Sequence, residues 1–108
     1  MSAPEPAYLK LDAAAMKKNA GQAVTLIKGL ANENRLMIMC ALCAGELSVG
    51  QLNQKIELSQ SALSQHLAIL RQQGLVATRR EGQTIFYSLR DSAALKVIQA
   101  LHDEFCPA

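Results

Sequence analysis

Residues 58–89 read LSQSALSQHLAILRQQGLVATRREGQTIFYSL, and within this stretch the spacing of apolar side chains changes. Ser59 is a favourable N-cap for a helix that continues to about Gln73. Three leucines fall on one face of this helix: Leu63, Leu67 and Leu70. The segments LVATRR and QTIFYSL then alternate on either side of a turn at Glu81 and Gly82, which predicts a β-hairpin.

The residues before this stretch have helical spacing. We expect a first helix from Asp12 to about Lys28, then one over 33–44 that Asn32 caps, and a short one over 49–56. A last helix ends at about Phe105. The expected fold class is therefore mainly α with a β-hairpin (α+β), with about five to six helices and a two-stranded wing.

Two short helices joined by a tight turn and followed by a hairpin are the parts of a winged helix-turn-helix. Residues 1–11 contain two prolines and are expected to form a flexible N-terminal arm. Residues 12–106 are expected to form one winged helix-turn-helix domain. The helix-turn-helix then spans 49–74 and the wing spans 75–90.

The positive charge is concentrated in one part of the chain, although the formal net charge is only +2. Residues 55–90 carry five Lys or Arg against two Asp or Glu, whereas 91–108 carry one against three. This distribution favours a phosphate-facing surface on the helix-turn-helix and wing. The sequence shows neither a membrane span nor a signal peptide, so we expect a cytoplasmic protein, nucleoid-associated when bound to DNA, whose thiols are reduced at rest.

The helix after Ser59 has a small polar face opposite its leucines, as insertion into a DNA major groove requires. Gln60, Ser61, Ser64 and Gln65 form this face. Glutamine can pair with adenine through two hydrogen bonds, and serine suits several bases or phosphates. A solvated polar face would look the same, but the basic hairpin that follows favours contact with double-stranded DNA.

The hairpin places Arg79 and Arg80 next to its turn, where they suit phosphate or narrow minor-groove contacts. A charged edge that prevents strand aggregation is the alternative. Arg71 can also reach the DNA backbone. His66 has two interpretations, a DNA contact or a partly buried histidine that is hydrogen-bonded within the domain.

The chain resembles the ArsR/SmtB family of bacterial repressors over about residues 20–106. Three segments carry the resemblance: LANENRLMIMCAL, ELSVGQL and residues 58–89. The resemblance implies a homodimer formed by helices 12–30 and 92–105. It also implies that the dimer reads a palindromic operator and that an inducing signal lowers its DNA affinity. The protein is then a transcriptional regulator and not an enzyme.

The common metal sites of this family are absent from the sequence. Ser48 and Gly50 stand where metal-sensing members carry thiolates, and neither can replace a soft ligand. Ala93 and Phe105 stand where a second site at the last helix needs ligands. No metal site and no cofactor are therefore expected.

Cys40 and Cys106 match a cysteine pair in a thiol-based subgroup of the family, of the HlyU, BigR and SqrR type. The resemblance implies that a persulfide, polysulfide or oxidant links the two sulfurs by a disulfide or a longer bridge. Burial would raise the pKa of Cys40 in its apolar helix, whereas Cys106 is expected to be exposed. Cys43 departs from the two-cysteine pattern, and its role is open.

Three alternatives remain at this point. Cys40, Cys43 and Cys106 could together bind a metal or metalloid, or all three could be structural, because buried free cysteines are common. A winged helix that binds proteins and not DNA would favour exposed aromatics, which the reading face lacks. A thiol enzyme is disfavoured, because no histidine is placed by the sequence to activate a cysteine and so small a core leaves little room for a substrate pocket.

Overall fold

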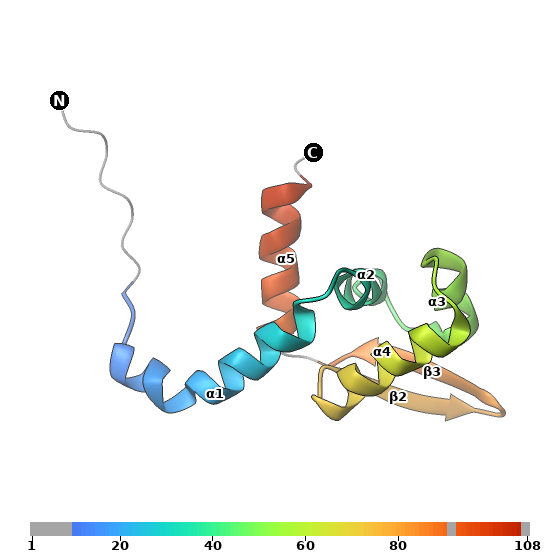
Figure 1. The fold of residues 1–108 in the computed structure, drawn as a ribbon, viewed down its shortest axis with the longest axis horizontal. Coiled ribbons are helices and arrows are strands. Elements are labelled where there is room, and N and C mark those ends of the chain that lie inside the picture. Colours follow the sequence, from blue (N-terminus) through green and yellow to red (C-terminus); the bar gives the residue numbers. More distant parts are fainter. Residues whose placement is uncertain (1–9, 91–92, 107–108) are drawn as a thin grey trace.

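A computed structural model describes residues 10–90 and 93–106 of the 108-residue chain. It contains five helices and three strands in the described part (Figure 1). Of the expected N-terminal arm, residues 1–9 lie outside the described residues. The elements are α1 (Ala13–Leu30), α2 (Glu33–Leu42), β1 (Leu47–Ser48), α3 (Val49–Lys55), α4 (Gln60–Gln72), β2 (Val76–Glu81), β3 (Thr84–Leu89) and α5 (Ala93–Phe105).

Side chains at the N-caps explain where four of the helices begin. The Asp12 carboxylate accepts a hydrogen bond from the backbone N–H of Ala15 at 3.1 Å. The Asn32 side chain accepts from two backbone N–H groups at the start of α2. Ser48 and Gln51 form a reciprocal capping box at α3, and Ser59 caps α4. The caps predicted at Asp12, Asn32 and Ser59 are confirmed.

Helix α2 forms the centre of the core. It packs against α1, α3, α4, α5 and β3. Ile38 and Met39 of α2 are fully buried, and so are the leucines of α3 and α4 that face it: Leu52, Leu63, Leu67 and Leu70. Each buried side chain of this size stabilises the fold by about 1.5–3 kcal/mol relative to exposure, so α2 holds the other elements together.

The wing belongs to a three-stranded antiparallel sheet with the order β1-β3-β2. Leu47 pairs with Tyr87, so the short β1 extends the hairpin that the sequence predicts. Gly82 has a φ of +64°, which glycine adopts without strain and which closes the β2–β3 turn. The expected winged helix-turn-helix is confirmed, with one strand more than the two expected.

Helix α1 approaches the end of α4 closely at Gly29. A Cβ atom at this position would overlap the side chains of Gln73 and Leu75. Because glycine has no Cβ, the last turn of α1 can lie directly against the segment that joins α4 to β2. This contact fixes where α1 leaves the body of the domain.

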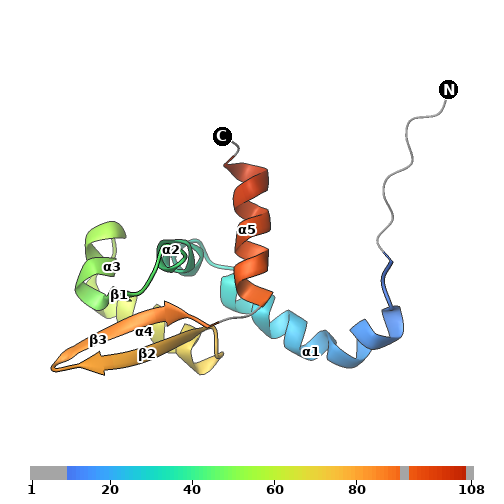
Figure 2. The ribbon, with the colours of Figure 1, turned by 180° about the vertical axis from the view of Figure 1, so that it is seen from behind.

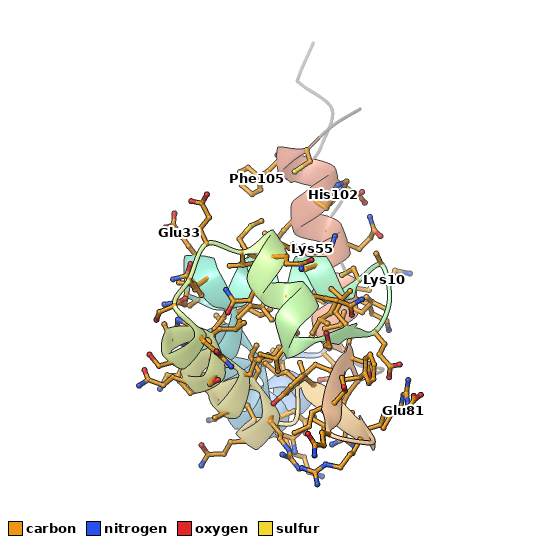
Figure 3. All side chains as sticks on the ribbon, turned by 90° about the vertical axis from the view of Figure 1, so that its right-hand side faces the viewer. Lys10, Glu33, Lys55, Glu81, His102 and Phe105 are labelled. Atoms are coloured by element: carbon orange, nitrogen blue, oxygen red, sulfur yellow. The ribbon has the colours of Figure 1, made fainter. Side chains whose placement is uncertain are left out.

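Helices α1 and α5 extend away from the helix-turn-helix and the wing (Figure 2). Figure 3 shows His102 and Phe105 at the projecting end of α5, well separated from Glu81 on the wing. Phe105 is 75% exposed and Ile27 of α1 is 59% exposed. Apolar side chains on both helices are therefore only partly covered by the chain itself.

No helix in the described part of the chain has both the length and the apolar character to cross a membrane.

Candidate nucleic-acid interface and thiol pocket

The predicted reading face lies on the exposed side of α4. Gln60, Ser61, Ser64 and Gln65 are all exposed, whereas the leucines of the same helix are buried. Ser61 Oγ lies 3.4 Å from the hydroxyl of the N-cap Ser59. The side chains that the sequence predicts to contact bases are thus presented to solvent on one helix, with a packed core behind it.

His66 lies on the flank of α4 that faces α2 and is half-buried. Its Nδ1 atom is 3.4 Å from Nη1 of Arg35 in the first turn of α2. Of the two interpretations given by the sequence, this geometry favours a histidine that is hydrogen-bonded within the domain.

The two arginines of the wing differ in their surroundings. Arg79 lies 2.7 Å from a carboxylate oxygen of Glu46 and 2.7 Å from one of Glu81, and its guanidinium stacks 4.6 Å from the ring centroid of Phe86. Hydrogen bonds to Glu46 and then to Glu81 raise the pKa of Arg79 above its ordinary value. Its charge is already balanced within the protein, so it is less available to a phosphate than the sequence suggests.

Arg80 follows on the opposite side of the strand, because side chains alternate along β2. It is exposed, and no described residue forms a hydrogen bond or ion pair with its side chain. Arg71 is likewise exposed in the last turn of α4 and lacks a side-chain partner in the described part of the chain. Within the described residues, both arginines are therefore exposed cations without a side-chain partner.

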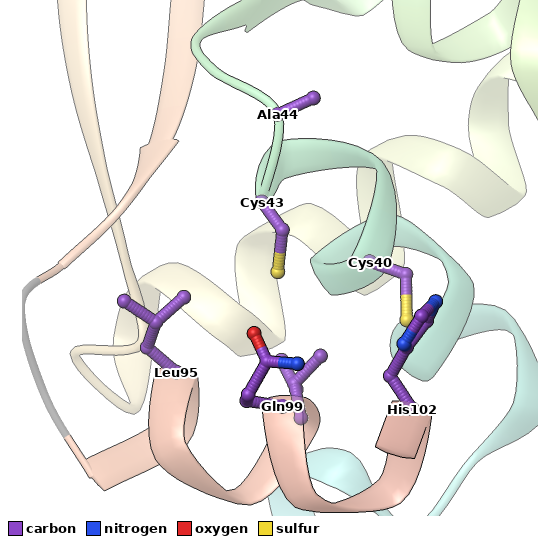
Figure 4. Close-up of a pocket in the computed structure, with 7 residues that line it drawn as sticks. Cys40, Cys43, Ala44, Leu95, Gln99 and His102 are labelled. Atoms are coloured by element: carbon purple, nitrogen blue, oxygen red, sulfur yellow. The ribbon is translucent and has the colours of Figure 1, made fainter. Parts of the chain in front are cut away.

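Two of the cysteines lie where α2 meets α5, and the third directly follows α5. Cys40 is half-buried, and Cys43 and Cys106 are exposed. Cys40 and Cys43 line a pocket of about 550 Å³ together with Leu95, Gln99 and His102 of α5 (Figure 4). The sequence alone placed no histidine where it could activate a cysteine, whereas the fold brings His102 into this pocket.

Burial raises the pKa of the Cys40 thiol, and the neighbouring charges of Cys43 and Cys106 raise it further. Burial also raises the pKa of Cys43. The raised pKa expected for Cys40 is confirmed. Among residues 10–90 and 93–106, no three His, Cys, Asp or Glu side chains are grouped so that they could hold a metal ion.

The fold brings several residues to these sites that no sequence pattern indicated. Glu46 and Phe86 hold Arg79, and Arg35 holds His66. The carboxylate of Glu46 is 33 residues from Arg79 in the chain, so no local pattern relates them. Of these residues, only Arg35 could have been singled out from the sequence, because it is a cation in a helix that is otherwise mostly apolar.

Comparisons with known proteins agree with the winged helix-turn-helix fold. Residues 32–78 match the family described as "Bacterial regulatory protein, arsR family". The chain is 55% identical over 93 residues to the transcriptional activator HlyU of Vibrio cholerae, a match that covers 86% of each protein. A solved structure of that HlyU superposes with a TM-score of 0.81 and covers 84% of this chain and 99% of that one.

Two repressors are also similar. The biofilm growth-associated repressor of Agrobacterium fabrum is 47% identical over 92 residues, which are 85% of this chain and 79% of that protein. The crystal structure of the transcriptional repressor BigR from Xylella fastidiosa has a TM-score of 0.84 at 41% identity and covers 91% of this chain and all of that one.

The different surroundings of Arg79 and Arg80 predict different salt effects. Replacing Arg80 with Gln should weaken binding to any duplex and reduce the slope of log K against log salt by about 1, because one phosphate contact is lost. The Arg79→Gln variant should keep the wild-type slope, since its guanidinium is held by Glu46 and Glu81. Anisotropy titrations at four salt concentrations measure both slopes; an equal reduction in the two variants would refute this assignment.

The raised pKa of Cys40 predicts slow alkylation at neutral pH. Since only the thiolate reacts, iodoacetamide should modify Cys40 more slowly than Cys106 at pH 7.5, and the Cys40 rate should keep rising as pH passes the range of an ordinary thiol. Mass spectrometry of quenched samples gives the rate at each site. In urea the two rates should converge; rates that already agree in the folded protein would contradict the effect of burial.

Proposed function

Because the chain belongs to the ArsR family of bacterial regulatory proteins, it is a DNA-binding transcriptional regulator, and we propose that it is a homodimeric repressor with a thiol switch. In this proposal each subunit reads one half of a palindromic operator through α4 and the wing. A bridge between Cys40 and Cys106 lowers the affinity for that operator. The inducer is a persulfide, a polysulfide or an oxidant.

The reading assignment is supported by the exposure and chemistry of α4. In this assignment, four exposed side chains of α4 would contact base edges in the major groove: Gln60, Ser61, Ser64 and Gln65. The guanidiniums of Arg71 and Arg80, which have no side-chain partner among the described residues, would contact phosphates. Such contacts fix the position of the protein along the duplex and add affinity for any DNA sequence.

The uncovered apolar faces of α1 and α5 support the homodimer. Five large apolar side chains on these faces are between 42% and 75% exposed: Met16, Val24 and Ile27 of α1, and Leu95 and Phe105 of α5. A second subunit would bury these side chains and would place two copies of α4 on one side of the assembly. Operator half-sites for such dimers lie about one DNA turn apart.

The observation that carries the thiol switch is the position of Cys106 relative to Cys40. Cys40 lines the same pocket as His102 of α5, and the backbone N–H of Cys106 donates to the carbonyl oxygen of His102 at 2.8 Å. One belongs to α2, the central helix of the core, and the other directly follows α5. A covalent bridge between them would join the sensing end of α5 to the helix against which α4 packs.

The chemistry balances with a persulfide RSSH as co-reactant. The exposed Cys106 thiolate attacks the outer sulfur and releases RSH, which leaves a persulfide on Cys106. The Cys40 sulfur then attacks the sulfur bonded to Cys106 Cβ, forms the disulfide and releases H₂S. The two thiols are oxidised by two electrons, and the sulfane sulfur is reduced. If the Cys106 persulfide first takes a second sulfane sulfur from another RSSH and releases RSH, Cys40 attacks the sulfur next to Sγ, releases H₂S and forms a trisulfide bridge.

The test is a fluorescence-anisotropy titration of a duplex that the reduced protein enriches from a randomised pool. Reduced protein should bind in the nanomolar range or tighter, and polysulfide treatment should weaken binding by about 5–150-fold, reversibly on addition of thiol. The Cys40→Ser and Cys106→Ser variants should bind as the reduced protein does and should not respond.

Cys43→Ser is the matched control, because it removes a thiol from the same pocket but leaves the proposed bridge intact. It should keep the response. If treated and untreated wild type bind alike, the cysteines are structural and the switch is wrong; if Cys106→Ser still responds, the bridge partner is wrong.

A further inference from the structure

One guanidinium links three helices of the domain. Arg35 in the first turn of α2 donates through Nε to the carbonyl oxygen of Gly29 at 2.8 Å and through Nη2 to that of Lys28 at 3.3 Å. Its third nitrogen, Nη1, lies 3.4 Å from Nδ1 of His66 on α4. The end of α1, the start of α2 and the middle of α4 therefore meet at a single side chain.

The chemistry of arginine fixes the proton position on His66. A guanidinium has donors and no acceptor, so Nδ1 of His66 must accept and the imidazole proton must lie on Nε2. The carbonyls of Lys28 and Gly29 are at the C-terminal end of α1, where the helix dipole favours a cation. Lysine could not replace this arrangement, because only the planar fork of arginine reaches three acceptors at once.

The linked helices have different tasks in the proposed dimer. The exposed apolar side of α1, which includes Val24 and Ile27, would lie against the second subunit, while Ser61 and Gln65 of α4 would face DNA. The angle between α1 and α4 therefore sets the distance between the two reading helices. Because half-sites lie about 34–36 Å apart, a small rotation at this junction is amplified at the operator.

We infer that Arg35 and His66 are positioning residues that fix the angle of α4 relative to α1 and thereby select the half-site spacing that the dimer accepts. The inference rests on the proposed function. His66 acts through its Nδ1 atom on Arg35 and not through Nε2 on DNA.

A matched pair of variants separates these two roles of His66. The amide oxygen of asparagine falls close to the position of Nδ1, so His66→Asn keeps an acceptor for Arg35 and loses the Nε2 donor. Glutamine places its amide near Nε2, so His66→Gln keeps a donor toward solvent and loses the acceptor for Arg35. Both variants are neutral and of similar size, and urea denaturation checks that both fold.

The probes are the duplex selected by wild-type protein, the same duplex with one base pair inserted between the half-sites, and a scrambled duplex. His66→Asn should bind the selected duplex within about twofold of wild type. His66→Gln should bind it about tenfold more weakly, as loss of a hydrogen bond to a charged group implies, with unchanged affinity for the scrambled duplex. It should also discriminate less between the two half-site spacings.

Arg35→Lys provides an independent variant. If the two residues act through each other, the double variant Arg35→Lys, His66→Gln should lose no more operator affinity than the weaker-binding single variant. Additive losses would overturn the inference. So would a larger loss in His66→Asn than in His66→Gln, because that result assigns His66 to direct DNA contact. If the wild-type protein enriches no sequence from the pool, the proposed function itself fails and the inference fails with it.

Discussion

The burial of α2 is the constraint on which the rest of the structure depends. Ile38 and Met39 are fully buried, and the helix packs against α1, α3, α4, α5 and β3. A helix surrounded in this way cannot shift without a change in its neighbours, since close-packed interiors transmit displacement. Both proposed activities of the chain, DNA reading and thiol chemistry, are therefore coupled through one packed element.

The two ends of α2 lead to the two candidate DNA-contacting elements. Near its N-terminus Arg35 holds His66 of α4, and just after its C-terminus Glu46 holds Arg79 of the wing. Cys40 lies between these contacts, on the side that faces α5. A bridge at Cys40 would thus act at the centre of a rigid element whose ends support the reading helix and the wing, which is a physical route from thiol state to operator affinity.

The sequence predicted the features that depend on local chemistry. Ser59 and Asn32 cap their helices because a side-chain oxygen accepts from N–H groups only two or three residues away. The pairings of Arg35 with His66 and of Arg79 with Glu46 could not be predicted, because the partners are 31 and 33 residues apart and meet only through tertiary packing. Arg79 therefore looked like a free cation.

The most direct test of the account is the distance between the two α4 helices in the dimer. A genetically encoded ketone amino acid at the exposed Gln72 accepts a spin label and leaves the three native cysteines free. Pulsed electron paramagnetic resonance on reduced and polysulfide-treated protein then gives the distance distribution. The account predicts a shift of about 2 Å or more on treatment that thiol reverses, with the operator-bound distance matching the reduced form. Identical distributions in the two thiol states would contradict it.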